Sequence, residues 1–297
     1  MRKILNSLPT RLLLPVLLAL SFTAQGRAQA QTPTPTQPPA TPSQPPANNA
    51  PPQLTNLISQ IDAAANQKNV EALIQFFSPN FTHSDGLTRQ SMAQTLTQLW
   101  QRYPNLKYQT QVQSWKPQGD AIVAETVTNI TGAQSQNPRD LVLNATIKSR
   151  QRYQDGKIVS QEILSENSQL KIGKQPPTVE VKLPQQVKPG QQYNFDAVVQ
   201  EPLGEDYLLG AAIEEPIEPK NYLNSSRVDL ELLSAGGLFK LGRAPVQPED
   251  LWISAVLIRG NGMTLVTQRL NVVGQKSPAA QKPASPRSQN LGVKGNN

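Results

Sequence analysis

The single histidine of the chain, His83, stands two residues before a carboxylate, Asp85, in the segment "NFTHSDG". A histidine beside a carboxylate can act as a general base. The same two residues also fit a turn in which Asp85 caps the backbone and His83 has no chemical role. The sequence leaves both interpretations open. One histidine cannot make a histidine-based metal site, and no carboxylates stand at ligand spacing, so we expect no metal and no cofactor.

Two further carboxylates, Glu125 and Glu162, lie inside strand-like runs. On a concave apolar face, such a carboxylate would have a raised pKa and could do acid–base work. The alternative for Glu125 is a cross-strand pair with Arg150 or Arg152 on a solvated face. His83, Asp85, Glu125 and Glu162 are therefore the candidate catalytic residues.

Glu162 belongs to the segment "RYQDGKIVSQEIL", in which two strand-like runs meet at a turn. Because side chains alternate along a strand, either Glu162 or its neighbours Gln161 and Ile163 point inward. Apolar residues fall on both faces. We favour the second arrangement, because Val159 and Ile163 are β-branched and Ser160, on the face of Glu162, is polar.

Four aromatic residues fall close together in the sequence, at the end of one predicted helix and in the strand after it. Such residues pack in a core or form a platform for a ligand. They are the predicted binding residues: Trp100, Tyr103, Tyr108 and Trp115.

Composition excludes several classes of site. The chain has no cysteine, which rules out disulfides, thiol nucleophiles and thiolate metal ligands. The segment "GGLFKLGRA" has glycines at the spacing of a phosphate-binding loop but lacks the Lys-Ser/Thr that follows them. Eight basic residues of the net +7 chain lie in 1–30 and 276–297, and the remainder holds 20 basic and 21 acidic residues. A near-neutral folded part argues against binding to nucleic acid.

The N-terminus has the pattern of an export signal. A basic start is followed by the apolar run "LLLPVLLALSFTA" and by Ala28-Gln29-Ala30, which fits a cleavage site. We predict a signal peptide over 1–30 and a periplasmic or extracellular protein, with an uncleaved membrane anchor as the alternative. Residues 31–52 are rich in proline and predict a disordered linker, and the basic tail 276–297 predicts disorder.

Hydrophobic periodicity then predicts three helices followed by four long strands in the first block. That order is typical of an α+β domain. The helices are expected near 54–65, 70–77 and 88–103, and the strands at 106–115, 121–131, 141–153 and 157–166.

The segments "FFSPNF", "THSDG", "LWQRYPNL" and "RYQDGKIVSQ" resemble the nuclear transport factor 2-like superfamily over residues 53–172, nearest to its SnoaL-like and ketosteroid-isomerase-like branches. The resemblance implies a cone-shaped domain over 53–174, in which a curved antiparallel sheet wraps the helices around a pocket. It also implies a Tyr and an acid as oxyanion donors with an Asp base in the isomerase branch. The first predicted helix has no tyrosine, which departs from that pattern.

The second block, 175–275, has about seven short strand patterns and predicts a separate β-sandwich. Its "VKPGQQYNF" resembles the Pro-Gly entry to a strand in bacterial immunoglobulin-like domains. The predicted fold class is thus an α+β cone followed by an all-β sandwich.

These patterns favour an exported, non-catalytic module that binds a small ligand or another protein. The alternative is a small cofactor-free isomerase or dehydratase with one of the four candidate residues as its base. The expected partners are a small apolar ligand or another envelope protein, with a homodimer formed through the sheet of the first domain.

Overall fold

The computed structural model describes residues 49–136, 139–222, 228–260 and 262–274. The predicted signal peptide, most of the linker and the tail lie outside these residues, so export stays a prediction. Within the described ranges, no helix combines the length and the apolar character needed to cross a membrane.

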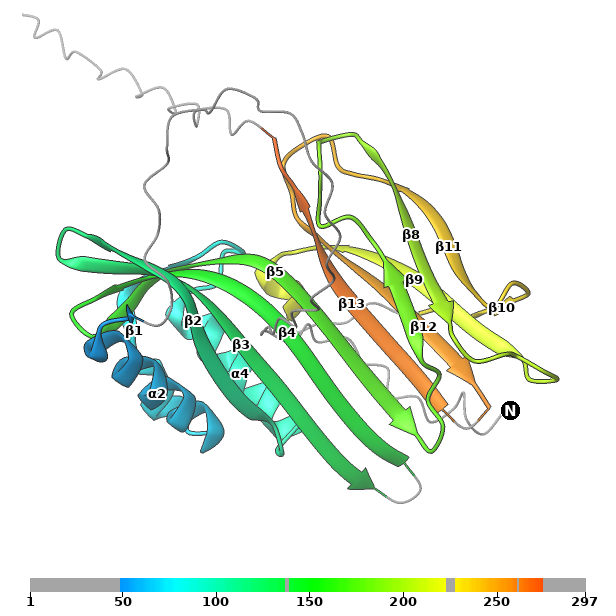
Figure 1. Ribbon diagram of the computed structural model, residues 1–297, viewed down its shortest axis with the longest axis horizontal. Helices are drawn as coiled ribbons and strands as arrows, with labels where there is room; N and C mark the ends of the chain where they lie inside the picture. The colour runs from blue at the N-terminus through cyan, green and yellow to red at the C-terminus, as the bar shows by residue number, and fades with distance from the viewer. Residues whose placement is uncertain (1–48, 137–138, 223–227, 261, 275–297) are drawn as a thin grey trace, which may run out of the picture.

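The three α-helices lie in the first part of the chain, with the short strand β1 before the last of them, and the long strands follow (Figure 1). The helices are α2 (Pro52–Asn66), α3 (Val70–Ile74), α4 (Arg89–Arg102) and the short 3-10 helix η2 (Pro219–Tyr222). The strands of the first block are β1 (Phe77–His83), β2 (Lys107–Gln118), β3 (Ala121–Gln136), β4 (Arg139–Gln154) and β5 (Lys157–Gly173). Those of the second block are β6 (Val179–Lys182), β7 (Gln186–Val187), β8 (Gln192–Val199), β9 (Leu208–Pro216), β10 (Glu231–Leu233), β11 (Gly237–Arg243), β12 (Leu251–Arg259) and β13 (Gly262–Val272).

Local signals in the sequence set the ends of the helices. The Asn69 side chain accepts a hydrogen bond from the Ala72 N–H at the start of α3. Thr88 and Ser91 form a reciprocal capping box at the start of α4. These caps satisfy backbone N–H groups that have no partner inside the helix and so fix the residues at which α3 and α4 begin.

One ten-stranded sheet runs through both halves of the chain, in the order β10-β9-β12-β13-β5-β4-β3-β2, with β1 and β7 paired at its side. A separate three-stranded sheet has the order β11-β8-β6. In Figure 1 the long strands β2 to β5 sweep over the helices, and β13 and β12 continue the same sheet beyond β5.

The predicted cone followed by a sandwich is therefore wrong. The sheet does not end at β5, because β13 pairs with it from Gly262 opposite Gly173 to Gln268 opposite Asn167. β5 is 17 residues long, and its last part carries apolar side chains that match those of β13, with Leu170 opposite Leu265. The mostly-β chain thus joins its two blocks by backbone hydrogen bonds. The division into 53–174 and 175–275 and the homodimer stay predictions.

The two halves of the large sheet are covered on opposite faces. The helices pack on one face of β2 to β5, and that core extends to Leu265 of β13. The next residue, Val266, points the other way into a second core with Phe195 and Ala197 of β8. Alternation along a single strand therefore serves both cores.

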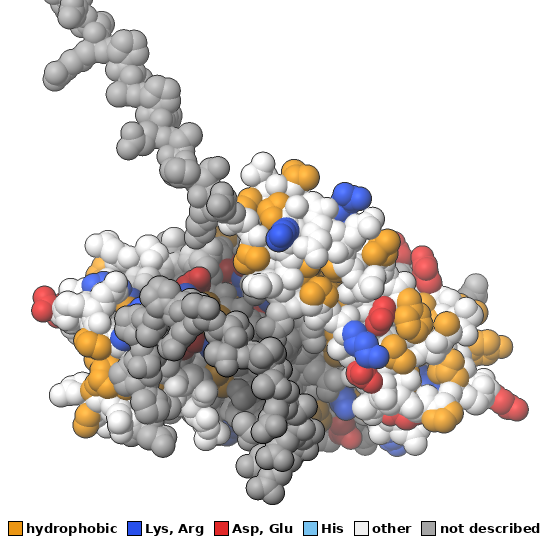
Figure 2. All heavy atoms as spheres, turned by 45° about the horizontal axis from the view of Figure 1, so that its top comes forward, with side chains coloured by type: hydrophobic (Ala, Val, Ile, Leu, Met, Phe, Trp, Pro, Cys, Tyr) orange, Lys and Arg blue, Asp and Glu red, His pale blue; other side chains and the backbone are white. Residues whose placement is uncertain are grey.

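The outer side of the C-terminal half carries scattered apolar side chains. Phe239 and Leu241 of β11 are exposed and share one face of the strand, whereas Lys240 between them points to the other face, where its Nζ lies 3.2 Å from Glu214. On the face shown in Figure 2, hydrophobic side chains lie among basic, acidic and polar ones. A pair of exposed apolar residues among polar and charged ones is a small patch of a size that is normal on a protein surface.

Candidate ligand-binding site

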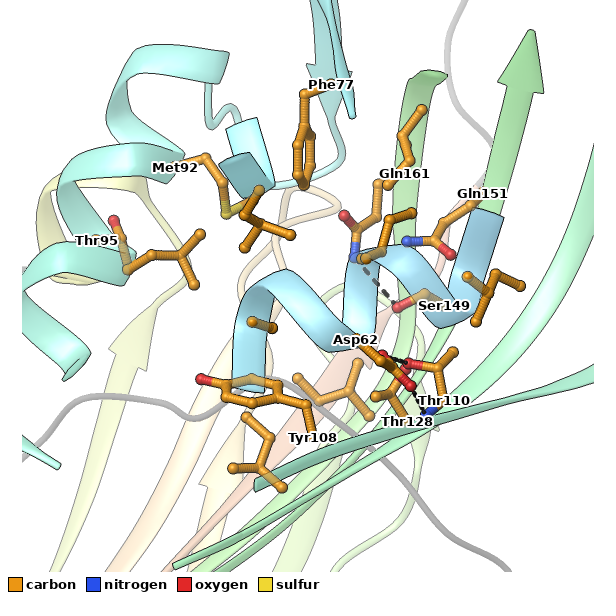
Figure 3. A pocket seen from close by; sticks show the side chains of 18 of the residues that line it. Asp62, Phe77, Met92, Thr95, Tyr108, Thr110, Thr128, Ser149, Gln151 and Gln161 are labelled. Carbon is orange, nitrogen blue, oxygen red and sulfur yellow. Dashed lines mark hydrogen bonds between the residues drawn. The ribbon is translucent and has the colours of Figure 1, made fainter. Parts of the chain in front are cut away.

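A cavity of about 120 Å³ lies between the helices and the covered face of the sheet. Figure 3 shows side chains from α2, α4 and the strands converging on it. Its lining is mostly apolar and consists of Ile58, Ile61, Asp62, Ala65, Leu73, Phe77, Met92, Thr95, Leu96, Leu99, Tyr108, Thr110, Thr128, Ile130, Ile147, Ser149, Gln151, Tyr153, Ile158 and Gln161.

The strands supply a row of polar groups along one side of this cavity. On β4 the inward positions change from apolar Ile147 to polar Ser149 and Gln151. Gln151 stands opposite Gln161 of β5, and the Gln161 Nε2 donates to Ser149 Oγ at 3.4 Å. Tyr153 Oη donates to Gln151 Oε1 at 2.5 Å. The sheet therefore holds amide and hydroxyl groups beside the apolar space.

α2 adds a carboxylate to the same site. Asp62 follows Ile58 by four residues and precedes Ala65 by three, which places all three on one helix face. The carboxylate accepts two hydrogen bonds from Thr110 of β2, from the backbone N–H to Oδ2 and from the hydroxyl to Oδ1, both at 2.6 Å. Burial raises the pKa of Asp62 above its ordinary value, although the hydrogen bonds from Thr110 act in the opposite direction.

Asp62 is the one charged residue among the described residues that line the cavity. The two tyrosines of the lining, Tyr108 and Tyr153, have pKa values raised by burial and stay neutral hydroxyls. Thr95 is buried on α4, and its Oγ1 has no hydrogen-bond partner in the described part of the chain. The cavity is thus apolar, with neutral polar groups and a single negative charge.

The four predicted aromatic residues are placed differently from one another. Tyr108 lines the cavity, and the Trp100 Nε1 donates to its hydroxyl at 2.7 Å. Tyr103 is buried in the same core but does not line the cavity. Trp115 is partly buried against that core. Of the four, Tyr108 therefore lines the cavity, and Trp100 contacts Tyr108 without lining the cavity itself.

His83 and Asp85 lie away from this cavity, in a buried cluster at the junction of the two halves. Asp85 pairs with Arg269 of β13, with Nη2 to Oδ2 at 2.6 Å and Nη1 to Oδ1 at 3.1 Å. The Tyr222 hydroxyl also donates to Asp85. His83 Nδ1 accepts from the Asp85 N–H at 3.1 Å, so the histidine is part of the turn. We call Asp85, Glu166, Tyr222, Asp250, Trp252 and Arg269 the Arg269 cluster.

Two more carboxylates of the Arg269 cluster, those of Asp250 and Glu166, also lie against Arg269. Asp250 Oδ2 accepts from Arg269 at 3.1 Å, and Glu166 Oε2 lies 3.6 Å from Arg269 Nη2. Trp252 Nε1 donates to Glu166 at 2.9 Å. Burial raises the pKa of Glu166 to about 7, against the lowering effect of Arg269. Burial lowers the pKa of His83 to about 4, against the raising effect of Asp85.

Glu125 and Glu162 lie on the solvated face of the sheet, opposite the helices. Arg150 bridges them, with 2.8 Å to each carboxylate, and Lys148 Nζ lies 2.8 Å from Glu125. Gln161 lines the cavity and Ile163 is buried, so the strand has the register with Glu162 outward. Glu125 therefore has Arg150 as its cross-strand partner, which is one of the two interpretations that the sequence left open.

None of the four candidate catalytic residues lines the cavity, whereas Asp62 does. The sequence carries a signal for Asp62 in the helix and not in the strands or loops where the candidate residues lie. It interrupts the apolar face of the first helix at a position four residues from Ile58. Likewise, Ser149 and Gln151 continue the apolar alternation of β4 with polar residues, which is typical of a strand that leaves a core and enters a pocket.

Comparison with known proteins gives partial likenesses. The model of a family described as a domain of unknown function (DUF8623) matches residues 174–273. Among curated proteins, none matches this chain.

Several solved structures resemble part of the chain. Bd1075 of Bdellovibrio bacteriovorus is 18% identical over 37% of this chain and 38% of that one, with a TM-score of 0.28. An uncharacterized cystatin fold protein from Novosphingobium aromaticivorans is 12% identical over 36% of this chain and 94% of its own, with a TM-score of 0.28. An LEH-like epoxide hydrolase of M. tuberculosis is 10% identical over 37% of this chain and 80% of its own, with a TM-score of 0.27.

Proposed function

We propose that this chain binds a small, largely apolar molecule in the cavity between its helices and its sheet. The observation that carries the proposal is the lining itself, an apolar space with a few polar groups from β4, β5 and α2 directed to one side. Ligand sites are typically concave and mostly apolar, with a small number of placed polar groups that fix orientation.

The size of the cavity limits the ligand. An apolar cavity of about 150 Å³ can hold benzene, so the 120 Å³ found here suits a body of about six carbon atoms or slightly fewer. Movement of Met92, an unbranched and adaptable side chain in the lining, would enlarge the space modestly.

The same lining supports binding better than turnover. Among the described lining residues there is no histidine, lysine or cysteine that could pair with Asp62 as a second catalytic group. Both Asp62 oxygens already accept from Thr110, which holds the carboxylate in place.

A second candidate function rests on the raised pKa of Asp62. A partly desolvated carboxylate beside an apolar body is suited to general base catalysis, as in a small cofactor-free isomerase. Exchange of ligand C–H protons with deuterated water, abolished in Asp62→Asn, would support that candidate. Absence of exchange in a ligand shown to be bound would leave simple binding.

The cellular setting is also a proposal. An export signal over 1–30 and a proline-rich tether would place the binding domain outside the cytoplasm. Detection of a mature chain that begins after Ala30 in the extracellular or periplasmic fraction tests this part.

The binding proposal is tested by amide NMR titration with a panel of six-carbon ring compounds that carry different polar groups. For at least one compound we expect shifts confined to α2, α4 and the inner positions of β2 to β5. Ala65→Leu should abolish them, because the added side chain fills the cavity from a buried position of α2. Ala63→Leu, at an exposed position of the same helix, is the matched control and should bind normally. Shifts that survive Ala65→Leu would place binding elsewhere and overturn the proposal.

A further inference from the structure

The charge of the cavity points to a more specific ligand class. We propose that the molecule bound there is a small organic cation, an ammonium group on an apolar body of about six carbons, with Asp62 as its counter-ion. This inference rests on the proposed binding function and adds the chemistry that selects the ligand.

The described residues of the lining give the Asp62 carboxylate no cation as a partner. Of the described residues that line the cavity, Asp62 alone is charged, and no lysine, arginine or histidine accompanies it. Thr110 supplies the hydrogen bonds that the carboxylate has, and these are neutral donors. A carboxylate held partly out of water without a cation is costly. A ligand that brings a positive charge would therefore form an ion pair that the lining residues do not provide.

The position of Asp62 suits a ligand head that stays partly hydrated. It is half-buried, between α2 and the edge strand β2, while the apolar residues of α4 line the opposite side in Figure 3. A charged ligand head beside Asp62 can therefore stay partly hydrated while its apolar body fills the dry part of the cavity. Phe77 and Tyr108 offer aromatic rings to the same ligand, and such rings attract cations.

The cation Lys68, near Tyr108, has its hydrogen-bond partners outside the cavity. Its Nζ lies 5.5 Å from the Tyr108 ring centroid but donates to the carbonyls of Ala65, Asn66 and Leu106. It is thus engaged at the end of α2 and does not line the cavity. Lys68 therefore leaves the negative charge of Asp62 available to a ligand.

The test compares three probes of nearly equal size on the full chain: cyclohexylamine, cyclohexanol and cyclohexanecarboxylate. By NMR titration at pH 7, we expect the amine to bind at least tenfold more tightly than the alcohol, and the carboxylate to bind most weakly. The affinity for the amine should fall as the pH is lowered through the titration of Asp62, whereas that for the alcohol should not change.

Two variants separate the role of Asp62 from the net charge of the protein. Asp62→Asn should reduce the affinity for the amine at least tenfold and change the affinity for the alcohol by no more than about twofold. Asp120→Asn removes the same charge at an exposed turn between β2 and β3, and should leave all three affinities unchanged.

The outcomes distinguish this inference from the proposal beneath it. If the alcohol binds in the cavity as tightly as the amine, and Asp62→Asn changes neither affinity, the inference that the ligand is a cation is overturned. The proposal of small-molecule binding then stands. If none of the probes binds, both are overturned. The ranking of the three probes on the native chain decides the question even if Asp62→Asn does not fold.

Discussion

Two of the carboxylate sites in the described part of the chain, one around Asp85 and one around Asp62, are built on opposite plans. In the Arg269 cluster, Asp85 forms a bidentate ion pair with the buried Arg269, and the Tyr222 hydroxyl donates a further hydrogen bond to it. In the cavity, Asp62 has two hydrogen bonds from Thr110 and no cation among the described lining residues. The opposite pKa shifts follow, since that of Asp85 is lowered and that of Asp62 is raised, although burial pushes both upward.

This difference separates a structural site from the proposed binding site. The charge of Asp85 is balanced within the fold, across the junction between β1 and β13, so the cluster holds the two halves together. The charge of Asp62 is balanced by nothing in the cavity lining, and the space beside it is empty of protein atoms. The contrast between an acid paired with arginine and an acid without a cation in its lining supports the proposal that a ligand supplies the positive charge at Asp62.

The largest effect should come from removing the cation of the structural site. Arg269→Met leaves Asp85 and Glu166 buried without their shared partner, and breaking such a pair typically costs about 3–5 kcal/mol of unfolding free energy. Urea denaturation at pH 7 measures the loss. Arg150→Met is the matched control, because Arg150 is about as close to two carboxylates but its side chain is 43% exposed. It should cost no more than about 1 kcal/mol, and equal losses in both variants would contradict the structural role of the cluster.

A smaller effect should appear in the pH dependence of the same site. The folded pKa of Glu166, about 7, exceeds its ordinary value of 4.5, so the folded state holds more protons and stability falls as pH rises through this window. The folded pKa of His83, about 4, is below its ordinary 6.5, so stability rises with pH between those values. The two slopes oppose each other where the windows overlap.

Single variants should expose these opposing slopes. Relative to the native chain, Glu166→Gln should gain stability as pH rises from 4.5 to 7, and His83→Gln should lose it as pH rises from 4 to 6.5, each by about 3 kcal/mol. Urea denaturation at several pH values measures both differences. Parallel curves for the three proteins would show that neither group titrates as the burial of the cluster implies.

The proposed binding site should respond to the loss of its charge in the opposite sense from the Arg269 cluster. Asp62→Asn should not destabilise the chain at pH 7 and should stabilise it by up to about 1 kcal/mol, because the partly desolvated charge disappears. Ionisation of Asp62 lowers the stability of the native chain as pH rises above the ordinary pKa of 3.8. The stability gain of Asp62→Asn over the native chain should therefore shrink toward acid pH. A loss of more than about 1 kcal/mol would mean that Asp62, like Asp85, is a structural acid.

The sequence predicted local elements better than their assembly. The three helices, the four long strands and the outward register of Glu162 follow from periodicity and capping, which depend on neighbouring residues. The pairing of β13 with β5 joins residues about a hundred positions apart, and a strand pattern does not name its partner. For the same reason the partner of Asp85, which is Arg269, was not predictable. Asp62 was predictable as a cavity residue from its helix face, but the volume beside it was not.

The smallest effect should come from Glu162, which has a carboxylate and a cation but little burial. Its side chain is 54% exposed and shares Arg150 with Glu125, so removal of its charge leaves Arg150 paired. Glu162→Gln should therefore change the unfolding free energy by no more than about 0.5 kcal/mol. Glu125→Gln is the matched comparison, because that side chain is 15% exposed and its loss leaves Lys148 without the partner shown here, so it should cost more, about 1 kcal/mol. Burial, and not the number of ion pairs, would then rank Arg269, Glu125 and Glu162, whereas a loss at Glu162 equal to that at Glu125 would contradict this order.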